Sequence, residues 1–235
     1  MNTIQSNKFF AILLLSIVVI FSANAHTPGP DYIYECPNCS NLLRKPTLMS
    51  GNTFWATFYS DGRMNAPMLP DLPDLTKCRR CDTVLWLSYM EKIGYEWFGR
   101  DGKAEWRDAD RAEFLDVADL ARFLEWDLVK NDQQRELTVR QRIWWTFNDR
   151  TRQGKDLLVD ENEEGLWRSN CLRLIELLDM RNIHERFIVA ELYRNLGKFE
   201  ESIALLNTII FEEHRSRVEL LIDASQQGNK LTLQL

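Results

Sequence analysis

The chain has 235 residues, enough for one medium domain or for a small domain followed by a larger one. Hydrophobic residues make up 45% of it, so it can fill a sizeable core, and its formal net charge is −6. This acidic balance argues against general binding to nucleic-acid phosphates, which requires a basic surface. We therefore expect no nucleic-acid partner.

Residues 1–25 have the pattern of a signal peptide. Lys8 is the only charged residue before an apolar run from Phe9 to Phe21. Ala23-Asn24-Ala25 then fits the small-x-small cleavage motif, so that His26 would begin the mature chain. The run is short for a membrane span, which takes about 20 residues. We expect a periplasmic or secreted protein with no stable membrane span after cleavage, and an uncleaved N-terminal membrane anchor is the alternative.

Two C-x-x-C pairs follow, Cys36 with Cys39 and Cys78 with Cys81. Two such pairs supply the four sulfurs that structural zinc prefers, and each pair can bind the ion from a tight turn. We predict these four cysteines as the ligands of a structural zinc ion in a zinc-ribbon-like module over residues 31–95. Because an exported protein meets an oxidising compartment, two disulfides are the alternative.

Between the cysteine pairs, aromatic and β-branched residues predict a strand over residues 52–59, with Phe54 and Phe58 on one face. A turn at Ser60-Asp61-Gly62 would end it. A second strand is predicted over residues 83–87.

From residue 108 to residue 228 the pattern is helical. No proline follows Pro73, so long helices are permitted. Apolar residues recur at helical spacing in several stripes separated by turn signals, which predicts five to seven helices. Cys171 lies on one of these stripes, and we expect it to be a buried, inert thiol.

One predicted helical hairpin, near residues 184–212, is similar to a tetratricopeptide unit. Small Ala190 and aromatic Tyr193 would lie on its first helix, and Gly197 would turn the chain into the second. Such repeats usually need about three neighbours to bury their apolar faces, and only one unit is recognisable in the sequence. We expect a single hairpin of this kind inside a larger helical domain spanning residues 108–228.

Several short segments carry a family resemblance. They are Leu48-Met49-Ser50-Gly51-Asn52-Thr53-Phe54, Ser60-Asp61-Gly62, Ala66-Pro67-Met68-Leu69-Pro70 and Ile143-Trp144-Trp145-Thr146-Phe147-Asn148-Asp149. With the second cysteine pair, they resemble a group of uncharacterised bacterial proteins that have an N-terminal zinc-ribbon-like double C-x-x-C segment and a C-terminal tetratricopeptide-like helical region. The resemblance covers most of residues 34–206 in patches, and it implies a fold without an activity.

We therefore predict an α+β protein, in which a small four-cysteine zinc-ribbon-like β module precedes a larger all-α, partly tetratricopeptide-like domain. The expected function is non-catalytic binding of a protein or peptide partner, or assembly, in the bacterial envelope. Helical hairpins offer concave grooves that take peptides or helices, and a four-cysteine metal site has no open position for catalysis. We predict no catalytic and no cofactor-binding residues.

Two enzymatic alternatives stay open. The turns at Gly51-Asn52 and Asp61 could line a small-molecule site, which would require Asn52, Asp61 and Arg63 to converge on a deep pocket. Cys36 and Cys39 could instead form the redox pair of a thiol-disulfide oxidoreductase, which would require an exposed Cys36 beside the start of a helix.

Overall fold

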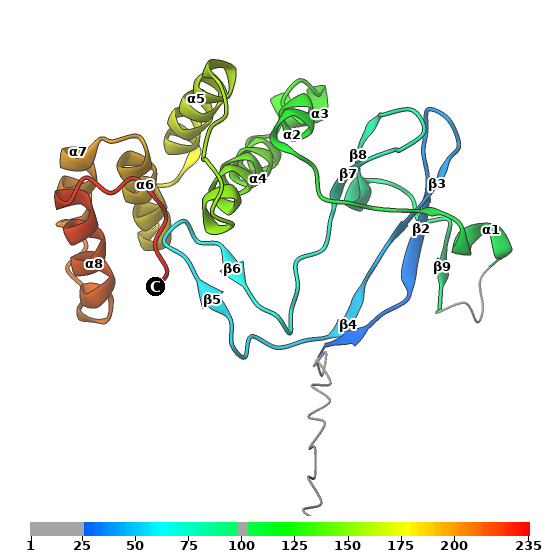
Figure 1. Cartoon of the computed structure of the whole chain (residues 1–235), viewed down its shortest axis with the longest axis horizontal. Helices are drawn as coiled ribbons and strands as arrows, with labels where there is room; N and C mark the ends of the chain where they lie inside the picture. Colours follow the sequence, from blue (N-terminus) through cyan, green and yellow to red (C-terminus); the bar gives the residue numbers. More distant parts are fainter. Residues whose placement is uncertain (1–25, 98–102) are drawn as a thin grey trace, which may run out of the picture.

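The structure is a computed structural model that describes residues 26–97 and 103–235. It has the predicted α+β architecture, with small β-sheets in the N-terminal part and helices in the C-terminal part (Figure 1). The predicted signal peptide lies outside the described residues. Within those residues, no helix combines the length and the hydropathy that a membrane crossing requires.

A four-stranded sheet forms the centre of the N-terminal module. β2 (Asp31–Glu35) pairs antiparallel with β3 (Leu42–Lys45) on one side and with β9 (Gly94–Glu96) on the other. After the short helix α1 (Ala104–Arg107), β10 (Asp110–Arg111) joins the free edge of β3 in parallel. The sheet therefore includes chain that lies well beyond the second cysteine pair.

A separate hairpin links this sheet to the helices. β7 (Leu75–Lys77) and β8 (Val84–Trp86) are antiparallel, so the second predicted strand is confirmed. Successive side chains of a strand point to opposite faces. Accordingly, Val84 and Trp86 belong to the main helical core, whereas Leu85 packs with the buried residues around the cysteines. The hairpin is thus shared by two cores.

Residues 46–70, here called the strap, leave the module, reach the helices and return (Figure 1). Near its start, β4 (Leu48–Ser50) pairs with β1 (Thr27–Pro28). At its far end, β5 (Thr57–Phe58) pairs with β6 (Met64–Asn65).

The predicted strand over residues 52–59 is wrong except at β5. The side chain of Asn52 accepts a hydrogen bond from the backbone N–H of Phe54 at 2.9 Å, and Trp55 has a φ of +58°. A side chain that bonds to nearby backbone in this way competes with strand pairing and favours a turn. Phe54 and Phe58 are consequently exposed and do not form one buried face.

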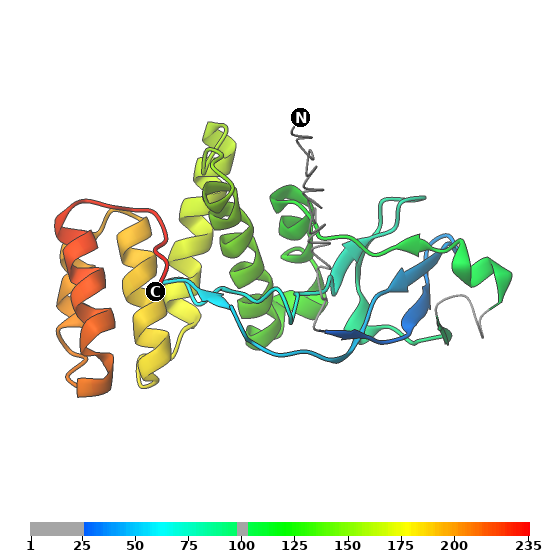
Figure 2. The ribbon, with the colours of Figure 1, turned by 60° about the horizontal axis from the view of Figure 1, so that its bottom comes forward.

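The helices follow one another in an array (Figure 2). They are α2 (Val117–Phe123), α3 (Asp127–Lys130), α4 (Gln133–Arg152), α5 (Glu161–Leu177), α6 (Ile183–Asn195), α7 (Phe199–Leu206) and α8 (Arg215–Gln226), and the 3-10 turns are η1 (Leu87–Tyr89) and η2 (Glu212–His214). Every residue after 108 is described, and its seven α-helices agree with the predicted five to seven. From α4 onward, each helix packs against the next one along the chain.

Polar side chains define where the long helices begin. Asp132, Asp160 and Asn182 accept hydrogen bonds from backbone N–H groups in the first turns of α4, α5 and α6, respectively. Gly197, with a φ of +77°, turns the chain from α6 into α7. The predicted helical hairpin is therefore present, and its assignment to the tetratricopeptide type stays a prediction.

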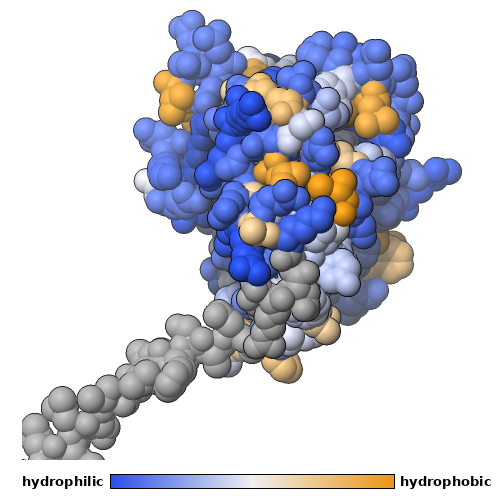
Figure 3. Space-filling view, turned by 90° about the vertical axis from the view of Figure 1, so that its right-hand side faces the viewer, coloured by the Kyte–Doolittle hydropathy of each residue, from blue (hydrophilic) through white to orange (hydrophobic). Residues whose placement is uncertain are grey.

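The main core is built around α4. Ile143, Trp144 and Phe147 are completely buried there, together with Cys171 from α5. The predicted burial of Cys171 is confirmed, and this burial raises the pKa of its thiol; that the thiol is inert stays a prediction. By contrast, the face of the N-terminal module in Figure 3 is predominantly hydrophilic, with separate hydrophobic spots.

Candidate metal centre

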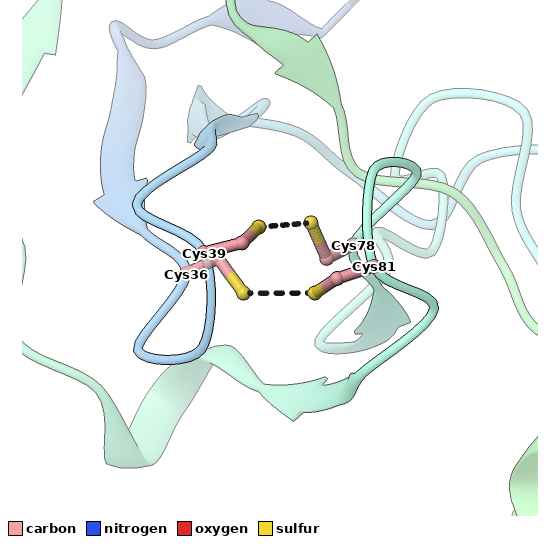
Figure 4. A group of neighbouring side chains, drawn as sticks. All are labelled: Cys36, Cys39, Cys78 and Cys81. Carbon is pink, nitrogen blue, oxygen red and sulfur yellow. Dashed lines mark hydrogen bonds between the residues drawn. The ribbon is translucent and has the colours of Figure 1, made fainter.

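The four predicted ligands lie at the tips of two hairpins and face one another (Figure 4). Cys36 and Cys39 connect β2 to β3, and Cys78 and Cys81 connect β7 to β8. The sulfur of Cys36 is 3.6 Å from that of Cys81, the sulfur of Cys39 is 3.6 Å from that of Cys78, and all four lie within 4.8 Å of one another. In a tetrahedral site with metal–sulfur bonds of about 2.3 Å, the sulfurs are about 3.8 Å apart. The four cysteines could therefore hold one metal ion.

The first hairpin tip is a tight turn with two backbone hydrogen bonds. Cys36 donates its N–H to the carbonyl of Asn41 at 2.9 Å, and Ser40 donates its N–H to the carbonyl of Cys36 at 2.9 Å. Ser40 has a φ of +55°, a left-handed conformation that reverses the chain directly after Cys39. The turn thereby places both sulfurs on the same side (Figure 4).

The second tip repeats this geometry. Cys78 donates its N–H to Thr83 at 2.9 Å, Asp82 donates its N–H to Cys78 at 2.8 Å, and Asp82 has a φ of +59°. The equivalence of the two hairpin tips was not predicted from the sequence, although the sequence contains a signal for it. Residues 34–43 and 76–85 align without gaps, and each cysteine of the second tip lies 42 positions after its counterpart.

The electrostatics of the cluster favour a bound cation. The hydroxyl of Thr83, 3.2 Å from the sulfur of Cys81, is the main cause that lowers the pKa of Cys81 to about 5. The backbone N–H of Asn41 favours the thiolate of Cys39, but desolvation and the neighbouring cysteines raise the pKa of Cys39 to about 12. The thiolate of Cys81 is thus favoured, whereas burial and the neighbouring cysteines oppose that of Cys39. A divalent cation would remove this opposition, because metal-bound thiols are deprotonated.

Apolar packing encloses the site from the inside. Cys36 and Cys78 are completely buried, whereas Cys39 and Cys81 are partly exposed. The other buried members of this cluster are Tyr34, Leu43, Leu85, Leu87 and Ala112. The hydrophobic cluster is small, which is the situation in which a metal ion contributes most to the stability of a module.

The oxidoreductase alternative requires an exposed Cys36 beside the start of a helix, and the cysteine site has neither feature. All five cysteines are free, and the 3.6 Å between paired sulfurs exceeds the roughly 2.05 Å of a disulfide bond. Cys36 is completely buried, burial raises the pKa of its thiol, and its turn leads into β3. A redox nucleophile is normally accessible, with a lowered pKa, at the start of a helix.

Asp61, the acid/base candidate of the other enzymatic alternative, is a buried anchor of the strap. It is 0% exposed, pairs with Arg152 and accepts a hydrogen bond from the side chain of Asn148 at 2.8 Å. Asn52 lies in a separate turn of the strap, and the guanidinium of Arg63 pairs with other carboxylates. The three residues therefore do not converge on a pocket.

Comparisons of the chain with models of protein families, with curated proteins and with solved structures found no match. Of the features shared with the uncharacterised bacterial proteins, the structure shows two, the clustered double C-x-x-C site and the helical region.

Proposed function

We propose that the protein is a non-catalytic binding or assembly protein of the bacterial envelope, held together by a structural zinc ion on Cys36, Cys39, Cys78 and Cys81. The observation that carries this proposal is the closed set of four sulfurs, all of which come from the chain itself. Such a set leaves no open position for a substrate or an activated water. The envelope location rests on the signal-peptide pattern of residues 1–25.

The zinc ion would connect the two parts of the molecule. Cys36 and Cys39 lie in the turn between β2 and β3 of the four-stranded sheet, and Cys78 and Cys81 lie in the turn of the hairpin β7–β8, whose Trp86 enters the helical core. Bound zinc supplies bonds to both hairpin tips at once. It would thereby hold the sheet in one orientation on the helices, which is a scaffolding role.

The far end of the strap lies on one face of the helical array. Its far end bonds to α4, where Trp145 donates to the carbonyl of Asp61 at 3.0 Å, and to α6, where Glu191 accepts from Ser60 at 2.8 Å. From α8, Arg217 donates to the carbonyl of Ser60 at 3.4 Å. A peptide partner would have to displace the strap to bind on this face, which makes it a poor partner surface.

The loops at one end of the array present a better partner surface. Met180 lies between α5 and α6, and Ile210 and Phe211 lie between α7 and α8, with 43%, 86% and 51% of their surfaces exposed. The rings of His184 and His214, next to these loops, are 6.3 Å apart, so the two loops are neighbours. Exposed apolar side chains gathered in this way are typical of protein-binding sites. We propose that a protein partner covers them.

Metal content and free-thiol count test the zinc site. In protein purified from its native compartment, we expect one zinc ion per chain and no disulfide among the four cysteines. Two disulfides without metal would contradict the zinc and support the oxidised alternative.

Site-specific photocrosslinking in cells tests the partner surface. A photoreactive residue at position 210 or 211 should give a discrete protein adduct. Val159 provides the control, because it is 71% exposed and lies between α4 and α5, at the opposite end of the array. Absence of adducts at 210 and 211, or the same adducts at 159, would contradict the proposal.

A further inference from the structure

The strap presents an exposed and uncharged aromatic surface. Its large exposed side chains are Met49 (64%), Phe54 (70%), Trp55 (78%), Phe58 (51%) and Leu69 (37%). Charged residues make up 27% of the whole chain, yet residues 46–60 contain no Asp, Glu, Lys or Arg. A surface that is both aromatic and free of charge differs from the ordinary surface of this protein.

The two charged residues of the strap are turned inward. Asp61 is completely buried against Arg152. Arg63 pairs with Asp71 at 2.8 Å and with Asp149 at 3.6 Å, and 20% of its side chain is exposed. The outer surface of the strap is therefore close to neutral along its whole length.

The two arms of the strap lie side by side, so these exposed side chains are carried on one narrow part of the molecule. Asn52 donates its backbone N–H to the carbonyl of Met68 at 3.2 Å. Gly51 lies so close to Leu69 that a Cβ on the glycine would be 2.8 Å from a methyl group of that leucine. Farther along, β5 pairs with β6.

The described chain begins at the same edge of the molecule. Thr27 of β1 is the register partner of Ser50 of β4, and their hydroxyl groups are 3.0 Å apart. Residues 9–21 are apolar and end five positions before His26, the first described residue. A segment of this hydropathy partitions into lipid. For as long as residues 1–25 stay attached, they would bring this edge of the molecule to the membrane.

We propose that the aromatic surface of the strap docks on the interfacial layer of a lipid bilayer. Trp is favoured at this depth because its ring is apolar and its N–H reaches water, and exposed aromatic and aliphatic side chains bury into the boundary between headgroups and acyl chains. The surface has no cations and the chain carries a formal charge of −6, so anionic headgroups would not attract it. The expected target is a zwitterionic bilayer. This surface is separate from the loops at Ile210 and Phe211, and the failure of either proposal leaves the other standing.

Vesicle flotation tests the docking without the apolar segment. The chain from His26 to Leu235, which retains every described residue, should float with phosphatidylcholine vesicles, and added salt should not weaken the binding. Replacing both aromatic residues in Phe54→Ser/Trp55→Ser should lower the partition coefficient about tenfold or more, because apolar area is no longer removed from water. The matched control is Val159→Ser/Leu220→Ser, which removes two exposed apolar side chains (71% and 40% exposed) outside the strap and outside the proposed partner surface and should bind like wild type.

Quenching by bromine-labelled lipids in the full chain locates the contact. Trp55→Phe keeps the surface apolar, so it should still bind vesicles while losing most of the lipid-dependent quenching. Three results would overturn the proposal: no flotation of the wild-type chain, flotation with anionic vesicles alone, or an equal loss of binding in the control variant. A discrete protein adduct from a photoreactive residue at position 54 in cells, together with flotation of Phe54→Ser/Trp55→Ser equal to that of wild type, would make the strap a protein-binding site, and the proposal would fail.

Discussion

Ser60 and Glu191 lie 131 positions apart in the chain and form a buried hydrogen bond that joins the strap to α6. The hydroxyl of Ser60 donates to Oε1 of Glu191 at 2.8 Å, and both residues are 0% exposed. Arg194 pairs with the same carboxylate at 2.6 Å, and the backbone N–H of Leu233 donates to Ser60 at 2.8 Å. Three distant segments, the strap, α6 and the C-terminal tail, therefore meet at one buried polar junction.

Removal of the carboxylate at this junction should strongly destabilise the protein. Glu191→Ala leaves Arg194 buried without its partner, and we expect it to lower the free energy of unfolding by about 3–5 kcal/mol. Glu191→Gln keeps an acceptor for Ser60 and should cost less. Denaturant unfolding near neutral pH measures both. Glu164→Ala on the exposed side of α5 is the control and should change stability by about 0.5 kcal/mol or less. A stability of Glu191→Ala equal to that of the control would show that the junction is not structural.

Deletion of residues 231–235 should loosen the far end of the strap. The backbone carbonyl of Leu231 accepts a hydrogen bond from Arg194 at 2.6 Å, and the N–H of Leu235 donates to the carbonyl of Phe58 at 2.9 Å. Without these bonds, backbone amides of residues 57–60 should exchange hydrogen faster, because local openings become easier. Amides at the hairpin tips around the cysteines serve as the internal control and should keep their rates. Unchanged exchange over 57–60 would show that the tail does not hold the strap.

Replacement of one of the four cysteines proposed as metal ligands should unfold part of the molecule. In Cys81→Ser we expect loss of the metal and of order in β2, β3 and β9, because their hydrophobic cluster is small. The helices should persist, since α4 and α5 have a core of their own. Metal analysis, far-UV circular dichroism and tryptophan fluorescence measure the change.

Cys171→Ser is the matched control for this substitution. It removes a thiol far from the site, should keep the metal, and should cost about 1–3 kcal/mol for the buried hydroxyl. If Cys81→Ser has the circular dichroism and fluorescence of wild type, the prediction of a structural role for the site is wrong.

Glu136 on α4 should make stability depend on pH. A hydrogen bond from Arg173, together with Arg140, lowers the pKa of Glu136 from 4.5 to about 2. A lowered pKa stabilises the folded state above the unfolded value of 4.5, and this contribution is lost as the pH falls toward 2. Because Arg173 is 43% exposed, solvent screening reduces the contribution to about 1 kcal/mol.

The substitution Glu136→Gln tests this dependence. Near neutral pH it should lower the free energy of unfolding by about 1 kcal/mol, and the difference from wild type should shrink as the pH approaches 2. Glu164→Gln, at an exposed position of α5, should show no such change. A difference that stays constant across this range would mean that Glu136 stabilises the helix through packing and not through its charge.

The cysteine site and the helices were predictable because their signals are local. Two residues between Cys36 and Cys39 are enough to define a chelating turn, whatever the rest of the chain does. The stripe that contains Cys171 shows helical spacing within a single helix, and its burial follows directly.

The strap was not predictable in this way, because its conformation depends on distant partners. The composition of residues 52–59 favours a strand, but no neighbouring strand is available to Phe54 and Trp55, and the side chain of Asn52 forms a turn instead. In the sequence, the position of Asp61 between Ser60 and Gly62 is typical of an exposed turn residue. Its burial is decided by Arg152 on α4, which lies 91 positions away.

The amino-acid sequence by itself determined the α+β class, the two chelating C-x-x-C turns and the series of helices, since each of these follows from spacing over a few residues. Only the tertiary structure decided that β7–β8 belongs to two cores, that the strap lies on the helices, and that Ser60 and Glu191 meet. The physical reason is that a buried polar group is stable only beside its partner, and the chain brings such partners together from more than a hundred positions apart.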